Sequence, residues 1–159
     1  MNPLASATSQ PRALLVLEDG TTFEGRCCGV SGETFGEIVF NTSMTGYQEI
    51  ISDPSYAGQI VTLTYPQVGN YGIDPAVMQR DTFHLCGFVV HDMCYEPSNW
   101  TSKQSLPEFL QENGIVAIEG IDTRALTMHL RDFGAQKAAI STEDLDPAHL
   151  LARVQASPN

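Results

Sequence analysis

Short apolar runs separated by turn residues dominate the first ninety positions of the chain. The run Leu14 to Leu17 is followed by Asp19-Gly20 and then by a second strand-like run, Thr21 to Gly25. Asp-Gly supplies the positive φ that a tight hairpin turn requires, so the opening predicts a β-hairpin. Further elements are expected in this half, namely strands over Phe35 to Phe40, Ile60 to Tyr65 and Gly87 to Val90, and one helical turn over Tyr47 to Ile51.

From Ser105 onward the hydrophobic period lengthens and helices alternate with strands. Ser105 and Glu108 have the spacing of a capping box, and with Gly114 as the stop they predict a helix from Leu106 to Asn113. The remaining elements expected are a strand over Ile115 to Ile118, a helix capped by Asp122 that buries Leu126, Leu130 and Phe133 and stops at Gly134, a strand over Gln136 to Ile140, and a helix opened by Asp146-Pro147 that carries Leu150, Leu151 and Val154. Strands followed by mixed helices and strands predict the α+β class.

Composition and charge narrow the classes of partner. The chain has 159 residues, of which 42% are apolar, which suits one domain with an ordinary packed core. Eight basic residues against 19 acidic ones give a formal charge of −11, which repels nucleic-acid phosphates and anionic lipids. The N-terminus has no apolar core of signal-peptide length, and no apolar run approaches the length of a membrane span. We therefore expect a cytoplasmic protein without nucleic-acid or membrane partners.

Cysteines and histidines give no sign of a metal or redox centre. No C-x-x-C or H-x-x-x-H spacing occurs, and no cysteine has the flanking glycines of a nucleophile elbow. The residues concerned are Cys27, Cys28, Cys86, Cys94, His84, His91, His129 and His149. The cysteines are expected to be small, half-buried hydrophobes. No metal and no other cofactor is expected in this domain.

The segment from Val39 to Pro66, VFNTSMTGYQEIISDPSYAGQIVTLTYP, combines strand-like apolar runs with turn residues. It resembles the signature stretch in the N-terminal domain of the small, glutamine-hydrolysing subunit of carbamoyl phosphate synthetase. Further matches follow in the same order as in that family: Ala13 to Gly25, Gly69 to Gly72, Asn99-Trp100 and Ile118 to Ile140. The resemblance covers about Ala13 to Ile140.

The resemblance implies a layered β/β/α fold, sometimes called swivelling, with mixed sheets and covering helices. Periodicity alone leaves a two-layer α+β domain as an equal alternative. The family resemblance also implies three parts of the chain. These are a flexible tail over residues 1–12, the N-terminal domain of the small subunit over 13–142, and a terminal helix with the start of a linker over 143–159. The linker would lead to a C-terminal amidotransferase domain that lies outside this chain.

By the same resemblance, the parent enzyme hydrolyses L-glutamine in the small subunit. The ammonia passes to a large subunit, which uses bicarbonate and two ATP to make carbamoyl phosphate for arginine and pyrimidine biosynthesis. The resemblance also implies that ATP and the divalent metal bind in the large subunit. This chain has no G-x-x-x-x-G-K-[ST] phosphate loop. This domain is therefore expected to lack catalytic residues, to contact the large subunit and to help shape the glutamine site.

Asp53-Pro54-Ser55-Tyr56 is the best candidate for direct contact with glutamine. Asp at the first position and Pro at the second predict a tight turn that leaves the Ser55 hydroxyl pointing outward. A hydroxyl both donates and accepts hydrogen bonds, which suits the ammonium and carboxylate groups of an amino acid. From the residues alone, an ordinary loop is favoured over a binding site. The resemblance implies that Ser55 contributes to the glutamine site from across the domain boundary.

Two alternatives from other classes remain open. A freestanding amino-acid-binding or regulatory module would need a pocket of its own. A small hydrolase would need a nucleophile with a base, for which Ser55 with His84 or His91 is the formal possibility, although no elbow motif supports it.

Candidate contacts with a partner subunit are few. Trp100 is a candidate interface anchor, with burial inside the domain as the alternative. Arg124 and Arg131 lie seven apart on one predicted helix and could pair with a partner's carboxylates, although solvent or the neighbouring Asp132 is the favoured environment.

Overall fold

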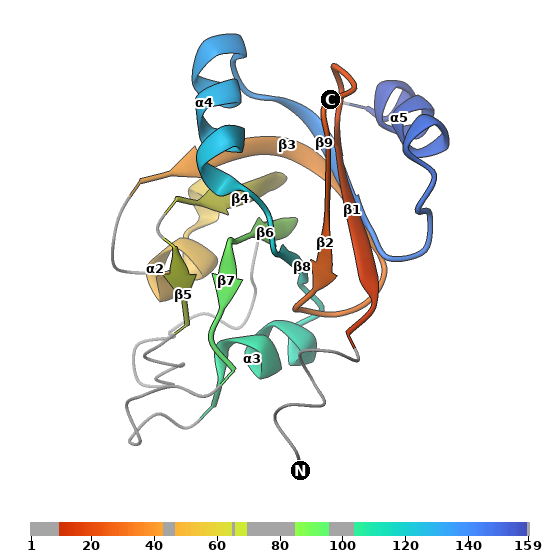
Figure 1. The fold of residues 1–159 in the computed structure, drawn as a ribbon. Helices are drawn as coiled ribbons and strands as arrows, with labels where there is room; N and C mark the ends of the chain where they lie inside the picture. The colour runs from red at the N-terminus through yellow and green to blue at the C-terminus, as the bar shows by residue number, and fades with distance from the viewer. Residues whose placement is uncertain (1–9, 43–46, 65, 70–84, 96–103, 159) are drawn as a thin grey trace.

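The computed structural model describes residues 10–42, 47–64, 66–69, 85–95 and 104–158 (Figure 1). The elements in chain order are β1 (Arg12–Leu17), β2 (Thr22–Cys27), β3 (Glu33–Asn41), α2 (Tyr47–Ser52), the 3₁₀ turn η1 (Pro54–Tyr56), β4 (Gln59–Leu63), β5 (Gln67–Val68), β6 (Gly87–Val89), β7 (Asp92–Met93), α3 (Leu106–Glu112), β8 (Val116–Glu119), α4 (Thr123–Phe133), β9 (Gln136–Ser141) and α5 (Pro147–Ala156). Where the sequence predicts a helix, strand or turn, the structure has one whose ends lie within a few residues of the predicted ends.

Seven strands close into a barrel in the order β1-β2-β8-β6-β4-β3-β9 (Figure 1). The pairs β3-β4, β4-β6 and β6-β8 are parallel, whereas β3-β9, β9-β1, β1-β2 and β2-β8 are antiparallel. Parallel neighbours require crossover connections, and α2 with η1 provides the one from β3 to β4. Strands β5 and β7 form a separate two-stranded sheet. The α+β class is confirmed, while the finer layered β/β/α arrangement stays a prediction.

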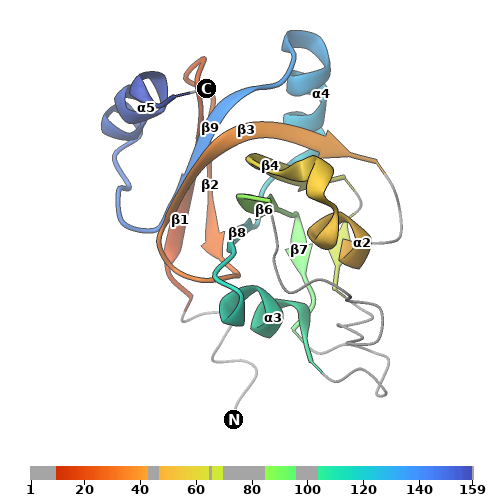
Figure 2. The same ribbon diagram turned by 180° about the vertical axis from the view of Figure 1, so that it is seen from behind.

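Strand β1 shows how an uninterrupted apolar run fits this barrel. Ala13, Leu15 and Leu17 join the cluster inside the barrel, and the alternate residues Leu14 and Val16 lie against α5 on its outside. A third cluster covers the outer face of β4, β6 and β8 and includes residues of α2 and α3, both of which lie outside the barrel (Figure 2). A strand buried on both faces has no polar alternation, which explains the ALLVL sequence.

The helix boundaries follow the predicted capping chemistry. The Ser105 hydroxyl accepts from the Glu108 amide at 3.3 Å, which is the N-cap bond of the predicted capping box. The Glu108 carboxylate accepts from the same hydroxyl at 3.0 Å. Asp122 and Asp146 each accept backbone amide bonds at the starts of α4 and α5. Gly134 ends α4 with a φ of 88°. Short-range chemistry therefore fixes these helix ends.

The prediction that Phe133 lies in the buried stripe of α4 is wrong. Leu126 and Leu130 are buried in the interior cluster, but Phe133 is 72% exposed and packs against the His129 ring with centroids 4.8 Å apart. Phe133 is the last residue of the helix, where α4 extends past the barrel strands (Figure 1). The i, i+4, i+7 spacing therefore predicts burial only for helix residues that lie over the barrel strands.

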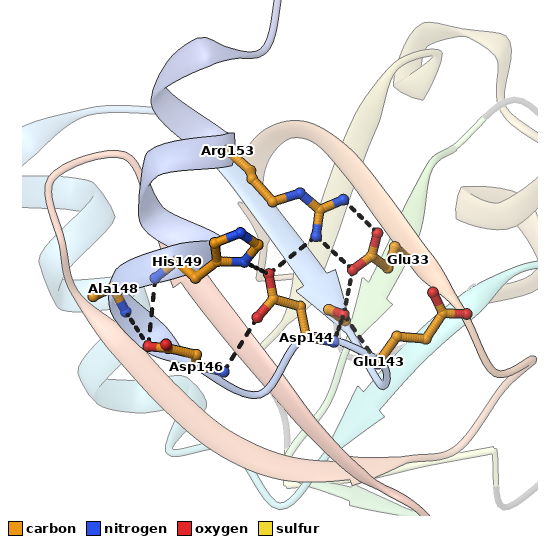
Figure 3. Close-up of polar contacts among 8 residues, drawn as sticks. Glu33, Glu143, Asp144, Asp146, Ala148, His149 and Arg153 are labelled. Carbon is orange, nitrogen blue, oxygen red and sulfur yellow. Dashed lines mark hydrogen bonds and ion pairs between the residues drawn. The ribbon is translucent and has the colours of Figure 1, made fainter.

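Helix α5 is fixed to the barrel by a charged network (Figure 3). Arg153 donates to both Glu33 oxygens, at 2.8 and 2.6 Å, and to Asp144 at 3.1 Å. His149 contacts the same Asp144 oxygen at 2.6 Å, and the guanidinium lies 5.2 Å from the centre of the Phe35 ring. The hydrogen bonds from Arg153 hold the pKa of Glu33 below its usual value. Helix α5 therefore packs on the domain rather than extending away from it.

Candidate functional site

The predicted turn at residues 53–56 is confirmed as η1. The Asp53 side chain accepts from the Ser55 amide at 2.9 Å, and the Tyr56 amide donates to the Asp53 carbonyl at 3.2 Å. Pro54 occupies the first helical position, where its missing N–H is not needed. Ser55 is exposed, and within the described part of the chain its hydroxyl makes no hydrogen bond. The hydroxyl is available for a partner, and its role toward glutamine stays a prediction.

Two contacts that the sequence did not indicate hold this turn against the barrel. The Asn41 side chain at the end of β3 donates to the Tyr56 hydroxyl at 2.8 Å. The Gly58 carbonyl accepts from the Glu37 amide at 3.1 Å. A Cβ atom at Gly36 would lie 2.7 Å from that carbonyl, so only glycine permits the approach. A glycine inside a strand was the one signal available in the sequence.

A groove of about 600 Å³ lies beside the turn. Ala57 and Gly58, which directly follow the turn, line one part of it, and Lys137, Ser157 and Pro158 line another. The two residues that directly follow the turn and the last described residues of the chain therefore line the same groove, although about one hundred residues of sequence separate them.

The structure does not bring Ser55 and His91 together. Strands β4 and β6 are parallel, with Ile60 paired to Gly87. Ser55 precedes β4 and His91 follows β6, so the two residues lie beyond opposite ends of this strand pair. His84, the other base considered, lies outside the described residues, as does Trp100. The hydrolase alternative thus loses one of its two candidate bases.

The described thiols are poorly suited to nucleophilic attack. Cys27 and Cys28 are buried, Cys86 and Cys94 are half-buried, and none of the four forms a disulfide within the described residues. Burial raises the thiol pKa of Cys27, Cys28 and Cys86, which disfavours the reactive thiolate. No group of three or more His, Cys, Asp or Glu side chains within the described ranges could hold a metal ion. None of the helices described is long and apolar enough to cross a membrane.

The other candidate contact residues are exposed on α4. Arg124 and Arg131 both face solvent, and the Arg131 guanidinium lies 5.8 Å from the centre of the Phe40 ring. The exposed environment favoured from the sequence is confirmed, although an aromatic ring on β3 accompanies Arg131.

Comparison with known proteins gives the family. The family model for the carbamoyl-phosphate synthase small chain, CPSase domain, matches residues 15–140. The chain belongs to this family. Similar relatives are the carbamoyl phosphate synthase small chains of Syntrophotalea carbinolica, 53% identical, and of Nitratidesulfovibrio vulgaris and Thermotoga maritima, both 55% identical. Each alignment covers 93% of this chain and 38–40% of the relative.

The carbamoyl-phosphate synthase small-chain family model includes the Ser55 turn and most of the barrel, but it ends before α5. The chain spans about two fifths of the length of these relatives, and the matched part is N-terminal. Among solved structures, an aminopeptidase from Aneurinibacillus aligns with 83% of this chain and 31% of its own, at a TM-score of 0.45 and 17% identity. That likeness is too low to support an argument about fold or function.

Proposed function

We propose that this chain serves as the N-terminal domain of the small, glutamine-hydrolysing subunit of carbamoyl phosphate synthetase, without catalytic residues of its own. The family match and the high identity to small-chain relatives support this role. The complete small subunit would release ammonia from L-glutamine in a C-terminal amidotransferase domain. A large subunit holding ATP and divalent metal would use that ammonia for carbamoyl phosphate synthesis in the cytoplasm.

The observation that carries the proposal is the place of Ser55. Its hydroxyl is exposed on a turn that Asp53 and the Asn41–Tyr56 pair hold against the barrel. The same groove that borders this turn also contains Ser157, near the end of the chain. A domain continuing from that end would begin near the Ser55 turn, where the exposed hydroxyl could bind the amino or carboxylate group of glutamine.

Replacing Ser55 with Ala in the complete small subunit, assembled with the large subunit, tests this role. Loss of one hydrogen bond to a charged group costs about 1.5–3 kcal/mol, so the KM for glutamine should rise roughly tenfold to hundredfold. Synthesis driven by added ammonia should be unchanged, because ammonia bypasses the glutamine site. Ser31→Ala, an exposed serine in the turn before β3, is the matched control. Equal losses with glutamine and ammonia would contradict the proposal.

The 159-residue chain alone should have no glutaminase activity, since burial disfavours the thiolates of Cys27, Cys28 and Cys86, and no base among the described residues is hydrogen-bonded to the Ser55 hydroxyl. Ammonia release above background that survives repurification and disappears in Ser55→Ala would favour the hydrolase instead. Saturable binding of glutamine to the isolated chain, measured by calorimetry, would favour the freestanding binding module.

Contact with the large subunit is the second part of the proposed role. A domain without catalytic residues acts through its contacts, and a stable interface of this kind buries at least about 1,200 Å² in total. A small subunit lacking residues 1–142 should therefore fail to co-purify stoichiometrically with the large subunit. Retained stoichiometric binding would rule out the docking role.

A further inference from the structure

Three segments that are distant in sequence meet at Lys137, in β9. Its ammonium group donates to the carbonyls of Gln155, at 3.2 Å, and Ser157, at 2.9 Å, in the last turn of α5 and just beyond it. The same group lies 3.7 Å from a carboxylate oxygen of Glu18, which directly follows β1. The Lys137 side chain is only 17% exposed. We call Glu18, Lys137, Gln155 and Ser157 the α5 clasp.

The α5 clasp is made of reciprocal bonds, so it orients the backbone as well as the side chains. The Glu18 amide donates to the Lys137 carbonyl at 2.8 Å, and the Gln155 side chain donates to the Glu18 carbonyl at 3.2 Å. Carbonyls at a helix end lack intrahelical partners, and a cation there also interacts favourably with the helix dipole. Lys137 satisfies one such oxygen, that of Gln155, and also the Ser157 carbonyl just beyond the helix, while Arg153 in the last turn binds Glu33 and Asp144 (Figure 3).

The α5 clasp borders the groove beside the Ser55 turn. Glu18, Lys137 and Ser157 line the groove together with Ala57 and Gly58. Lys137 therefore sets the direction of the backbone at Ser157, which lines the same groove as the two residues that follow the turn. Any chain that follows would start from an orientation fixed by Lys137 relative to Ser55.

We infer that Lys137 is a positioning residue for glutamine use: by binding the carbonyls at the end of α5, it sets how the following domain meets Ser55. This inference rests on the proposed role of Ser55. Lys137 does not touch glutamine in this scheme. Its effect reaches the substrate through the path of the chain.

Hydrogen–deuterium exchange on the complete small subunit tests the structural half of the inference. Lys137→Met keeps most of the aliphatic stem and removes the donor group, so amide exchange over residues 154–157 should become about tenfold faster. Lys137→Arg, which keeps a cationic donor, should restore most of the protection. Arg12→Met removes a cation whose partner, Glu24, is likewise exposed and away from the groove, and it is the matched control. Unchanged exchange in Lys137→Met would overturn the inference.

Steady-state kinetics of the assembled enzyme test the functional half. In Lys137→Met the KM for glutamine should rise roughly threefold to tenfold, with Lys137→Arg close to wild type and the ammonia-driven rate unchanged. An unchanged KM in Lys137→Met, while Ser55→Phe raises it, would overturn this inference alone. If Ser55→Phe also leaves the KM unchanged, the proposed role of Ser55 fails and the inference fails with it. A parallel fall of the ammonia-driven rate would show general damage to the fold and would also overturn it.

Discussion

Two turns on this barrel begin with an aspartate that receives a backbone N–H two residues later. In the hairpin between β1 and β2, Asp19 accepts from the Thr21 amide at 3.0 Å and from the Gln136 side chain at 3.0 Å. Its second oxygen also lies 2.6 Å from the His129 ring nitrogen. The Asp19 carboxylate thus joins the hairpin to α4 and to the start of β9.

The turn at Asp53 uses the same local chemistry with a different result. Asp53 fixes the Ser55 amide at 2.9 Å, and Tyr56 anchors the turn, while the Ser55 hydroxyl faces solvent. These three contacts of Asp19 are directed within the domain, whereas the Asp53 turn presents an additional polar group at the surface. The difference indicates that the first turn serves stability and the second suits recognition.

The largest expected effect comes from filling the space in front of the second turn. In the complete small subunit, Ser55→Phe should lower kcat/KM for glutamine by at least about a hundredfold, because the ring occupies space that the amino acid needs and also removes the hydroxyl. Ammonia-driven synthesis should remain at the wild-type rate. Both rates are measured on the assembled enzyme.

Ser31→Phe supplies the control for a large apolar ring added to an exposed turn, since Ser31 is exposed and does not line the groove. Its glutamine kinetics should match wild type. If Ser55→Phe behaved like Ser31→Phe, the contrast between the two aspartate turns would have no functional meaning.

The next effect concerns stability and the first turn. Asp19→Ala removes the acceptor shared by the hairpin, α4 and β9, and it should lower the free energy of unfolding of the 159-residue chain by about 2 kcal/mol. Urea denaturation followed by circular dichroism measures this change. A loss below that of Asp53→Ala would reverse the assignment of roles to the two turns.

Local chemistry explains which parts of this molecule the sequence could predict. The Asp19-Gly20 hairpin, the Ser105 capping box and the Asp53-Pro54 turn each depend on residues within about four positions, and all three are confirmed. Barrel closure depends on pairs such as Arg26 with Glu119, which no periodicity specifies. The order of the strands therefore could not be derived from the pattern.

The same distinction between local and tertiary features applies to the candidate site. The outward position of Ser55 followed from the Asp-Pro rule, but the contacts that hold its turn and the chain end join separate elements. The Asn41–Tyr56 bond and the Lys137 contacts with α5 appear only when β3, β9 and α5 are assembled. Sequence patterns identify the group that is presented, and the tertiary structure supplies what positions it.

A smaller effect is expected from weakening the second turn at its origin. Asp53→Ala removes the side-chain acceptor for the Ser55 amide and should cost about 1 kcal/mol or less in stability, the usual value for such a cap. The KM for glutamine should rise by a factor of a few, because Asp53 no longer holds the backbone amide of the residue that carries the hydroxyl. Asp53→Asn, which retains an acceptor oxygen, should recover most of both losses. A full effect in Asp53→Asn would show that charge rather than turn geometry matters.

The smallest expected effect is the pH dependence that Asp19 contributes. Burial raises the pKa of its carboxyl, but hydrogen bonds from Thr21, His129 and Gln136 outweigh burial and hold the pKa well below its usual value. The unfolded chain, with an Asp pKa of about 3.9, then takes up this proton first as the pH falls. The carboxylate therefore contributes stability above about pH 4 that is lost progressively on acidification. Because the side chain is 36% exposed, solvent screening keeps this contribution to about 1 kcal/mol or less.

Urea unfolding between about pH 5 and about pH 3 should show a steeper loss of stability in wild type than in Asp19→Asn, whose amide does not titrate. Glu33 and the other carboxylates are the same in both proteins and cancel in the comparison. Equal slopes would mean that the hydrogen bonds at Asp19 do not depend on its charge.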